Sequence, residues 1–182
     1  MNRYHKFFAT TLCSALFFIA SDVSAAVTGI LPIIGDGAFQ GWIPVGVSGA
    51  VHFDAINDLP CNGNTDFVAT ASTTLRESFW VDLAGVPDGA TIDKIFISPC
   101  ASSGTGPTST MDVFAVHNGV SSPDIGGYTL TGTTPTTLST ATFNNVNIVK
   151  SAGDVLEIGA VYSSGSGGVR LSRIHAVIEY TP

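Results

Sequence analysis

Glycine and proline occur so often after residue 25 that the chain has little room for long helices. All 20 Gly and 9 Pro lie beyond that point, and the longest stretch free of both in this part of the chain is Asn64–Ala84. That stretch is rich in Thr and Val and lacks the three- and four-residue apolar spacing of an amphipathic helix. The sequence therefore predicts short strands joined by turns.

Alternation of apolar and polar residues locates several strands. In the segment 75–83 the apolar residues share one face with Glu77, while Arg76, Ser78, Trp80 and Asp82 share the other. Further strands are predicted at 91–98, 110–117, 154–162 and 169–180, with weaker ones near 126–130, 138–143 and 146–149.

Turn signals separate these strands. Val86-Pro87-Asp88-Gly89 has the composition of a tight turn, and Ser163–Gly168 is expected to be the loop of a hairpin. Many short strands with turns every 8–12 residues are typical of an all-β, antiparallel β-sandwich, here of a jelly-roll-like kind. A parallel α/β sheet is not expected.

The first 25 residues resemble a secretory signal peptide. Arg3 and Lys6 precede a mostly apolar run over 7–20, and the small residues Ser24 and Ala25 follow. The run is shorter than the about 20 residues that a membrane span needs. We expect cleavage near Ala25 and a mature chain without a membrane span, secreted or held at the cell surface, with the periplasm as an alternative.

Residues 26–182 are expected to form a single domain. The segment 26–60 is the least patterned and fits either an N-terminal arm or the first strands of the same sandwich. Removal of the leader leaves Cys61 and Cys100, which are expected to form a disulfide in an oxidising compartment. Two unpaired buried thiols are the alternative.

Charge excludes one broad class of function. The formal net charge is -7, with only 7 Lys and Arg, whereas a nucleic-acid-binding protein needs basic side chains to displace phosphate counterions. A hydrophobic share of 45% also excludes a disordered chain, which cannot bury enough apolar surface.

Several short motifs resemble those of a poorly characterised module of secreted proteins from environmental bacteria. They are Gly35-Asp36-Gly37 with Trp42, His52-Phe53-Asp54, Thr65-Asp66-Phe67-Val68, the segments 86–92 and 99–103, and the closing segment 169–180. The resemblance implies a small jelly-roll-like β-sandwich without an established catalytic set.

The sequence offers little support for catalysis or for a metal site. Ser48 lacks the complete G-x-S-x-G elbow, and His52, His117 and His175 stand singly, without metal-ligand spacing. Glu77, Glu157 and Glu179 could supply the paired acids of a glycoside hydrolase, but the sequence brings no two of them together. A glycan-active hydrolase is therefore the least favoured function.

Oxygen-bearing side chains gather in the segment 54–66. Asn62, Asn64 and Asp66 recur at every second position, which suits a structural Ca²⁺ ion. The Gly and Glu of an EF-hand loop are missing, and Asn, Asp and Gly are also ordinary turn residues, so a turn is preferred. No cofactor is expected.

Trp80 is the leading candidate for ligand binding, together with Arg76 and Asp82 on the same strand face. An exposed indole with polar neighbours could stack on a sugar ring. The alternative is that a loop, or the segment 26–60, covers Trp80 as part of a second small core.

Two classes of function stay ahead of an enzyme. The first is a non-catalytic structural or adhesive protein that associates with itself or with other cell-surface proteins, since low charge weakens repulsion between copies. The second is a carbohydrate-binding module whose partner is a polysaccharide.

Overall fold

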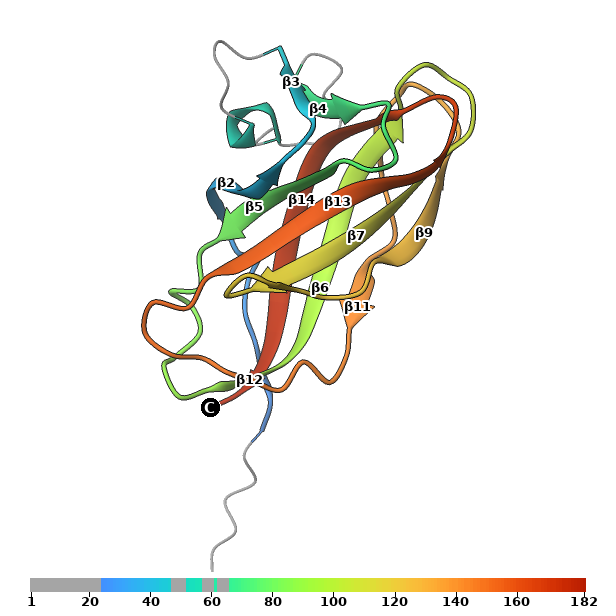
Figure 1. The fold of residues 1–182 in the computed structure, drawn as a ribbon. Helices are drawn as coiled ribbons and strands as arrows, with labels where there is room; N and C mark the ends of the chain where they lie inside the picture. Colours follow the sequence, from blue (N-terminus) through green and yellow to red (C-terminus); the bar gives the residue numbers. More distant parts are fainter. Residues whose placement is uncertain (1–23, 47–51, 57–60, 62–65) are drawn as a thin grey trace, which may run out of the picture.

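The computed structural model describes residues 24–46, 52–56, 61 and 66–182 (Figure 1). Within these residues the regular elements are strands and one short 3-10 helix. The strands are β1 (Ala26–Val27), β2 (Ile33–Gln40), β3 (Ile43–Val45), β4 (Phe67–Thr70), β5 (Arg76–Val81), β6 (Thr91–Ser103), β7 (Ser109–His117), β8 (Val120–Ser121), β9 (Ile125–Leu130), β10 (Thr136–Thr137), β11 (Ala141–Phe143), β12 (Ile148–Val149), β13 (Leu156–Gly165) and β14 (Val169–Thr181). The 3-10 helix η1 spans Phe53–Ile56.

The strands form two sheets. The first sheet has the order β10-β6-β14-β4-β3, with β1 paired to β14 and with β11 and β12 paired to β6. The second sheet has the order β2-β5-β13-β7-β8, with β9 paired to β7. The strand pairs of the described residues are antiparallel, and the two sheets lie face to face (Figure 1). The prediction of an antiparallel β-sandwich is confirmed.

The hydrophobic core lies between the sheets. Phe79 and Val81 of β5 belong to this core together with Ile174, Ala176 and Ile178 of β14, and all five side chains are buried. This is the face that alternation predicts for both strands. Among the described residues, no helix is long and apolar enough to cross a membrane.

The prediction of a hairpin loop at Ser163–Gly168 between the last two strands is wrong. β13 pairs with β5 and β7 in the second sheet, whereas β14 pairs with β6 and β4 in the first. The chain between Gly165 and Val169 therefore crosses from one sheet to the other, with positive φ at Gly165 and Gly168. The alternation of apolar and polar residues could not predict this crossing. It shows which face of a strand is buried, but not whether two strands lie side by side in one sheet or face each other in two.

The strands before residue 46 take part in both sheets. β1 pairs with β14, β2 with β5, and β3 with β4. The pairing of β2 is irregular, because the register with β5 shifts between Asp36 and Gln40. This segment of β2 therefore bulges away from its neighbour.

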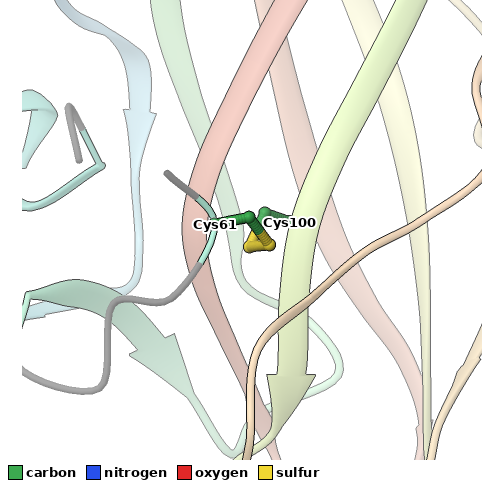
Figure 2. Close-up of a disulfide and its surroundings, with 2 residues drawn as sticks. All are labelled: Cys61 and Cys100. Carbon is green, nitrogen blue, oxygen red and sulfur yellow. A yellow bond between two sulfur atoms is a disulfide. The ribbon is translucent and has the colours of Figure 1, made fainter. Parts of the chain in front are cut away.

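Cys61 and Cys100 form the predicted disulfide (Figure 2). Cys100 lies on β6 and is fully buried, and the two Cα atoms are 5.9 Å apart. The bond ties Cys61, which precedes β4 in the chain, to β6 of the first sheet. Of the residues considered for calcium, Asn62 and Asn64 lie outside the described part of the chain, and Asp66 directly precedes β4.

Candidate ligand-binding site

Trp80 stands on the outer face of the second sheet and is 45% exposed. Its cross-strand neighbours are Gly35 on β2 and Glu157 on β13. A Cβ atom on Gly35 would lie 3.6 Å from the indole Cε3, so the ring rests against strand backbone that carries no side chain. The indole is thereby supported from the β2 side while part of it stays open to solvent.

The indole borders a shallow depression of about 300 Å³. Its apolar lining includes Ile34 and Val155, and its charged lining consists of Asp82, Lys150 and Asp154. Asp82 follows β5 and accepts a hydrogen bond from the backbone N–H of Ala84 at 2.8 Å. The depression thus combines one large aromatic side chain with two carboxylates.

Asp154 is held firmly in this wall. Its carboxylate accepts hydrogen bonds from the Ser151 backbone N–H at 2.9 Å and from the Asn118 side-chain amide at 3.1 Å, and it contacts His117 Nε2 at 3.2 Å. The Ser151 and Asn118 donors, followed by His117, lower the pKa of Asp154 to about 2. Asp154 is therefore an ionised acceptor at any physiological pH.

Lys150 contributes a cation that already has a partner. Its ammonium group forms an ion pair with Asp88, which lies in the turn before β6. The turn is the one that Val86-Pro87-Asp88-Gly89 predicts, and Gly89 has the positive φ it requires. The net charge of the depression, with this pair neutralised, is negative.

Arg76 lies apart from the depression, although the sequence grouped it with Trp80. Its guanidinium binds both carboxylate oxygens of Asp124, at 2.7 and 2.6 Å, and stacks 4.4 Å from the centre of the Phe114 ring. The structure brings Trp80 and Asp82 together and adds Lys150 and Asp154. Sequence reasoning missed these two because nothing in a single sequence shows that the segment before β13 lies beside the end of β5.

A second cluster of polar groups lies inside the sandwich. His52 Nδ1 is 2.7 Å from Glu77 Oε1, and the other oxygen of Glu77 accepts a hydrogen bond from the Trp42 backbone N–H at 3.0 Å. Asp36 accepts hydrogen bonds from the backbone N–H groups of His52 and Phe53. Sequence reasoning treated His52 as isolated, whereas the structure buries it against an acid.

Burial raises the pKa of Glu77 to about 7. Desolvation is the largest cause, the Trp42 N–H and His52 act in the opposite direction, and the charge of Asp36 adds to the rise. Neither Glu77 nor His52 lines the depression at Trp80. Their contacts hold Trp42 and His52 against the second sheet, and the Glu77 side chain is fully buried.

Glu157 lies on the opposite face of the second sheet from Glu77. It accepts hydrogen bonds from the Ala38 backbone N–H at 2.8 Å and from Ser78 Oγ at 2.6 Å. Because successive side chains of a strand point to opposite faces, the sheet separates the two carboxylates. They cannot flank one glycosidic bond.

Comparisons with solved structures give weak likenesses, and two of them are to carbohydrate-binding modules. The structure of carbohydrate-binding module CBM36 in complex with calcium and xylotriose is similar over 80% of this chain and 99% of that chain, with 20% identity and a TM-score of 0.37. The CBM36-1 domain of a multidomain xylanase from the hindgut metagenome of Trinervitermes trinervoides covers 87% of this chain and 98% of its own, with 12% identity and a TM-score of 0.38. The chain matches no family model and no curated protein. The case for a function therefore rests on the residues of the site.

Proposed function

We propose that the chain is a non-catalytic extracellular module that binds a neutral, hydroxyl-rich polysaccharide at Trp80. The observation that supports this proposal is the half-exposed indole beside Asp82 and Asp154 in an open depression. An indole offers an apolar surface to the C–H face of a sugar ring. A carboxylate accepts short, charge-assisted hydrogen bonds from hydroxyl groups at the ring edge.

The charges at the site favour a neutral polysaccharide over an acidic one. Asp82 and Asp154 would repel the carboxylates of a uronic-acid polymer. Lys150 offers little compensation, because its ammonium group already pairs with Asp88. A chain of uncharged sugars meets no such repulsion.

The sheet edges weigh against the structural or adhesive role, which was the first of the two functions that the sequence favoured. β3, at one edge of the first sheet, is three residues long and contains Pro44, and β2, at an edge of the second, is bulged. Pro and bulges prevent another strand from adding to an edge. Exposed edges of this kind are poor templates for assembly through strand pairing.

The acidic side chains of the described residues favour polysaccharide binding over glycoside hydrolysis. A glycoside hydrolase needs a general acid that keeps its proton near neutral pH. Asp154 cannot serve, because its pKa of about 2 leaves it ionised. Glu77 and Glu157 are separated by the sheet and bound to backbone N–H groups.

Replacement of Trp80 by Ala tests the proposal. We expect the secreted form to be retarded in native gels that contain a neutral polysaccharide, with hydroxyethylcellulose and galactomannan as the probes. The Trp80→Ala variant should bind at least about tenfold more weakly, which corresponds to about 1.4 kcal/mol. The melting temperature should change little, because Trp80 lies outside the main core.

Val120→Ala is the matched control, since Val120 is 74% exposed and does not line the depression. This variant should bind like the unaltered chain. Polygalacturonate tests the preference for a neutral polymer and should cause no retardation. Equal binding by the two variants would refute the role of Trp80, and preferential binding of polygalacturonate would refute the neutral ligand.

A further inference from the structure

A second cavity lies between the two sheets. It has a volume of about 660 Å³ and opens where the β11–β12 edge of the first sheet faces the β8–β9 edge of the second. Ile95, Phe143 and Ile148 line it from the first sheet, and Ala115, Ile125 and Leu156 from the second. Cavities that bind small molecules fall in the range of roughly 300–1,000 Å³.

The lining carries no strongly charged side chain. No Asp, Glu, Lys or Arg is among the residues that border this cleft in the described part of the chain. Its one titratable side chain, His117, already contacts Asp154. A ligand that carried a charge would lose its hydration here without gaining a partner, which costs free energy.

Polar groups lie at the mouth of the cleft, and most of them are already engaged. The amide of Asn118 bonds to Asp154 and to the Val155 backbone N–H, and Ser122 Oγ accepts from the Ala115 N–H and donates to Pro123. The exposed amide of Asn144 makes no hydrogen bond with the described residues. The cleft therefore offers a long apolar wall and few free hydrogen-bonding groups.

We propose that this cleft binds an uncharged lipid-like molecule, an alkyl or acyl chain with one neutral polar end such as a hydroxyl or an ester. The apolar walls from both sheets take the hydrocarbon chain, and the Asn144 amide bonds the polar end. A sugar fits poorly, because most of its hydroxyls would lose water without finding a partner. The site is separate from Trp80, which does not line the cleft.

Displacement of a neutral fluorescent probe tests this proposal. We expect Nile red to bind the secreted form saturably, at one site per chain, with a blue-shifted emission. Two competitors of equal chain length separate a neutral polar end from a charged one. At pH 8, 1-dodecanol should displace Nile red at a concentration at least about tenfold lower than dodecanoate. Equal displacement, stronger displacement by dodecanoate, or no saturable binding would overturn the proposal.

Matched variants locate the probe. Val146→Asp places a carboxylate in the wall of the cleft, and Val120→Asp places one at its mouth, where Val120 is largely exposed and the fold tolerates the change. Both should weaken Nile red binding at least about tenfold. Val149→Asp is the control, because Val149 is exposed on β12 and does not line the cleft. If Val149→Asp weakens binding as much as Val120→Asp, the probe binds elsewhere.

Two further readouts complete the test. Trp80→Ala should leave Nile red binding unchanged, and Val120→Asp should leave retardation by polysaccharide unchanged. The proposal for either site can therefore be refuted without refuting the other. Sedimentation velocity checks whether a second copy of the chain fills the cleft. A dimer that 1-dodecanol dissociates would identify the cleft as an interface between copies and would overturn the proposed ligand.

Discussion

Buried carboxylates in this chain serve its backbone. The bulge in β2 removes backbone N–H groups from regular strand pairing, and buried N–H groups need other acceptors. Glu157 accepts from Ala38, Ser78 Oγ accepts from Phe39, and Glu77 accepts from Trp42. These side chains stabilise an irregular strand that runs beside the candidate site.

The position of Gly37 leaves no room for a side chain beside Ser78 and Glu157. A Cβ atom at this position would lie 2.2 Å from Ser78 Oγ and 2.5 Å from Glu157 Oε2. Gly37→Ala should therefore lower the free energy of unfolding by about 1–3 kcal/mol through overpacking and displaced hydrogen bonds. Urea denaturation measures the loss.

Gly29→Ala is the control for Gly37→Ala. Nothing lies within 4 Å of a Cβ atom built on Gly29, and its φ is not in the left-handed region. The substitution should leave the midpoint of denaturation within experimental error. A loss at Gly29 equal to that at Gly37 would show that the close approach to Ser78 and Glu157 is not the cause.

Protonation of Glu77 should make the fold more stable at mildly acidic pH than at neutral pH. Its pKa is about 7 in the folded state and 4.5 in its ordinary state, so between these values the folded chain binds the proton more tightly. The contribution of Glu77 to the free energy of unfolding therefore rises as the pH falls from about 7 toward 4.5. Asp154 does not make the free energy of unfolding depend on pH between 4.5 and 7, because its lowered pKa has an effect only below its ordinary value of 3.8.

His175 acts in the opposite direction, and a variant separates the two groups. Burial, and then the charge of Arg173, lower the pKa of His175, so its protonation favours the unfolded chain. Glu77→Gln removes only the carboxyl titration, while His52 and Asp36 stay in place. Urea denaturation at several values between pH 4.5 and 8 should show a smaller gain toward low pH for Glu77→Gln. Parallel profiles for the two proteins would contradict the assignment.

At the scale of the strand, alternation predicts faces well and neighbours poorly. It placed Trp80 and Asp82 on one side and Phe79 and Val81 on the buried side, and the structure has Trp80, and Asp82 just after β5, at one depression and the other two in the core. It also grouped Arg76 with Trp80, but four residues along a strand span about 13 Å. A shared face therefore does not make a shared site.

The parts that sequence reasoning missed depend on contacts between distant segments. Asp154 comes to the site from the segment before β13, and His52 reaches Glu77 from the position just before η1. Glu77 itself was visible as an acid on an apolar face, and this is the signal that could have predicted a buried partner. The choice of that partner required the fold.

The disulfide is expected to carry a large share of the stability of the first sheet. Cys61 and Cys100 are 39 residues apart in sequence, and closing a loop of that length stabilises the fold by about 4 kcal/mol in the chain-entropy model. The Cys61→Ser, Cys100→Ser double variant should show this loss in urea denaturation under oxidising conditions.

Dithiothreitol provides the control for the double variant. It should shift the denaturation midpoint of the unaltered chain toward that of the double variant and leave the double variant unchanged. A double variant as stable as the unaltered chain would mean that the bond between Cys61 and Cys100 does not constrain the unfolded state.

At the scale of the whole molecule, the two candidate cavities share a wall. Asp154 lines the depression at Trp80, while His117 and Asn118, which contact it, line the cleft between the sheets. The depression lies on the outer face of the second sheet, and the cleft opens between the two sheets. One molecule can therefore present a polar ligand and an apolar ligand to separate surfaces.

Truncation tests where the folded molecule begins. We propose that the leader is removed near Ala25, which would leave β1 intact, because β1 spans Ala26–Val27. Deletion of residues 1–25 should leave the melting temperature unchanged. Deletion of residues 1–28 should lower it, because it removes β1 and the hydrogen bonds between Thr28 and Ile178. Equal melting temperatures for the two deletions would contradict this boundary.

The antiparallel pairing of β1 with β14 also decides how the molecule would respond to a pull. Ala26 lies opposite Tyr180 and Val27 opposite Glu179, so the ends of the described chain lie together at one pole (Figure 1). Tension between the two ends would separate β1 from β14 starting at that pole, so the hydrogen bonds of the pair would break one after another. Such a geometry yields at low force, because the bonds do not share the load.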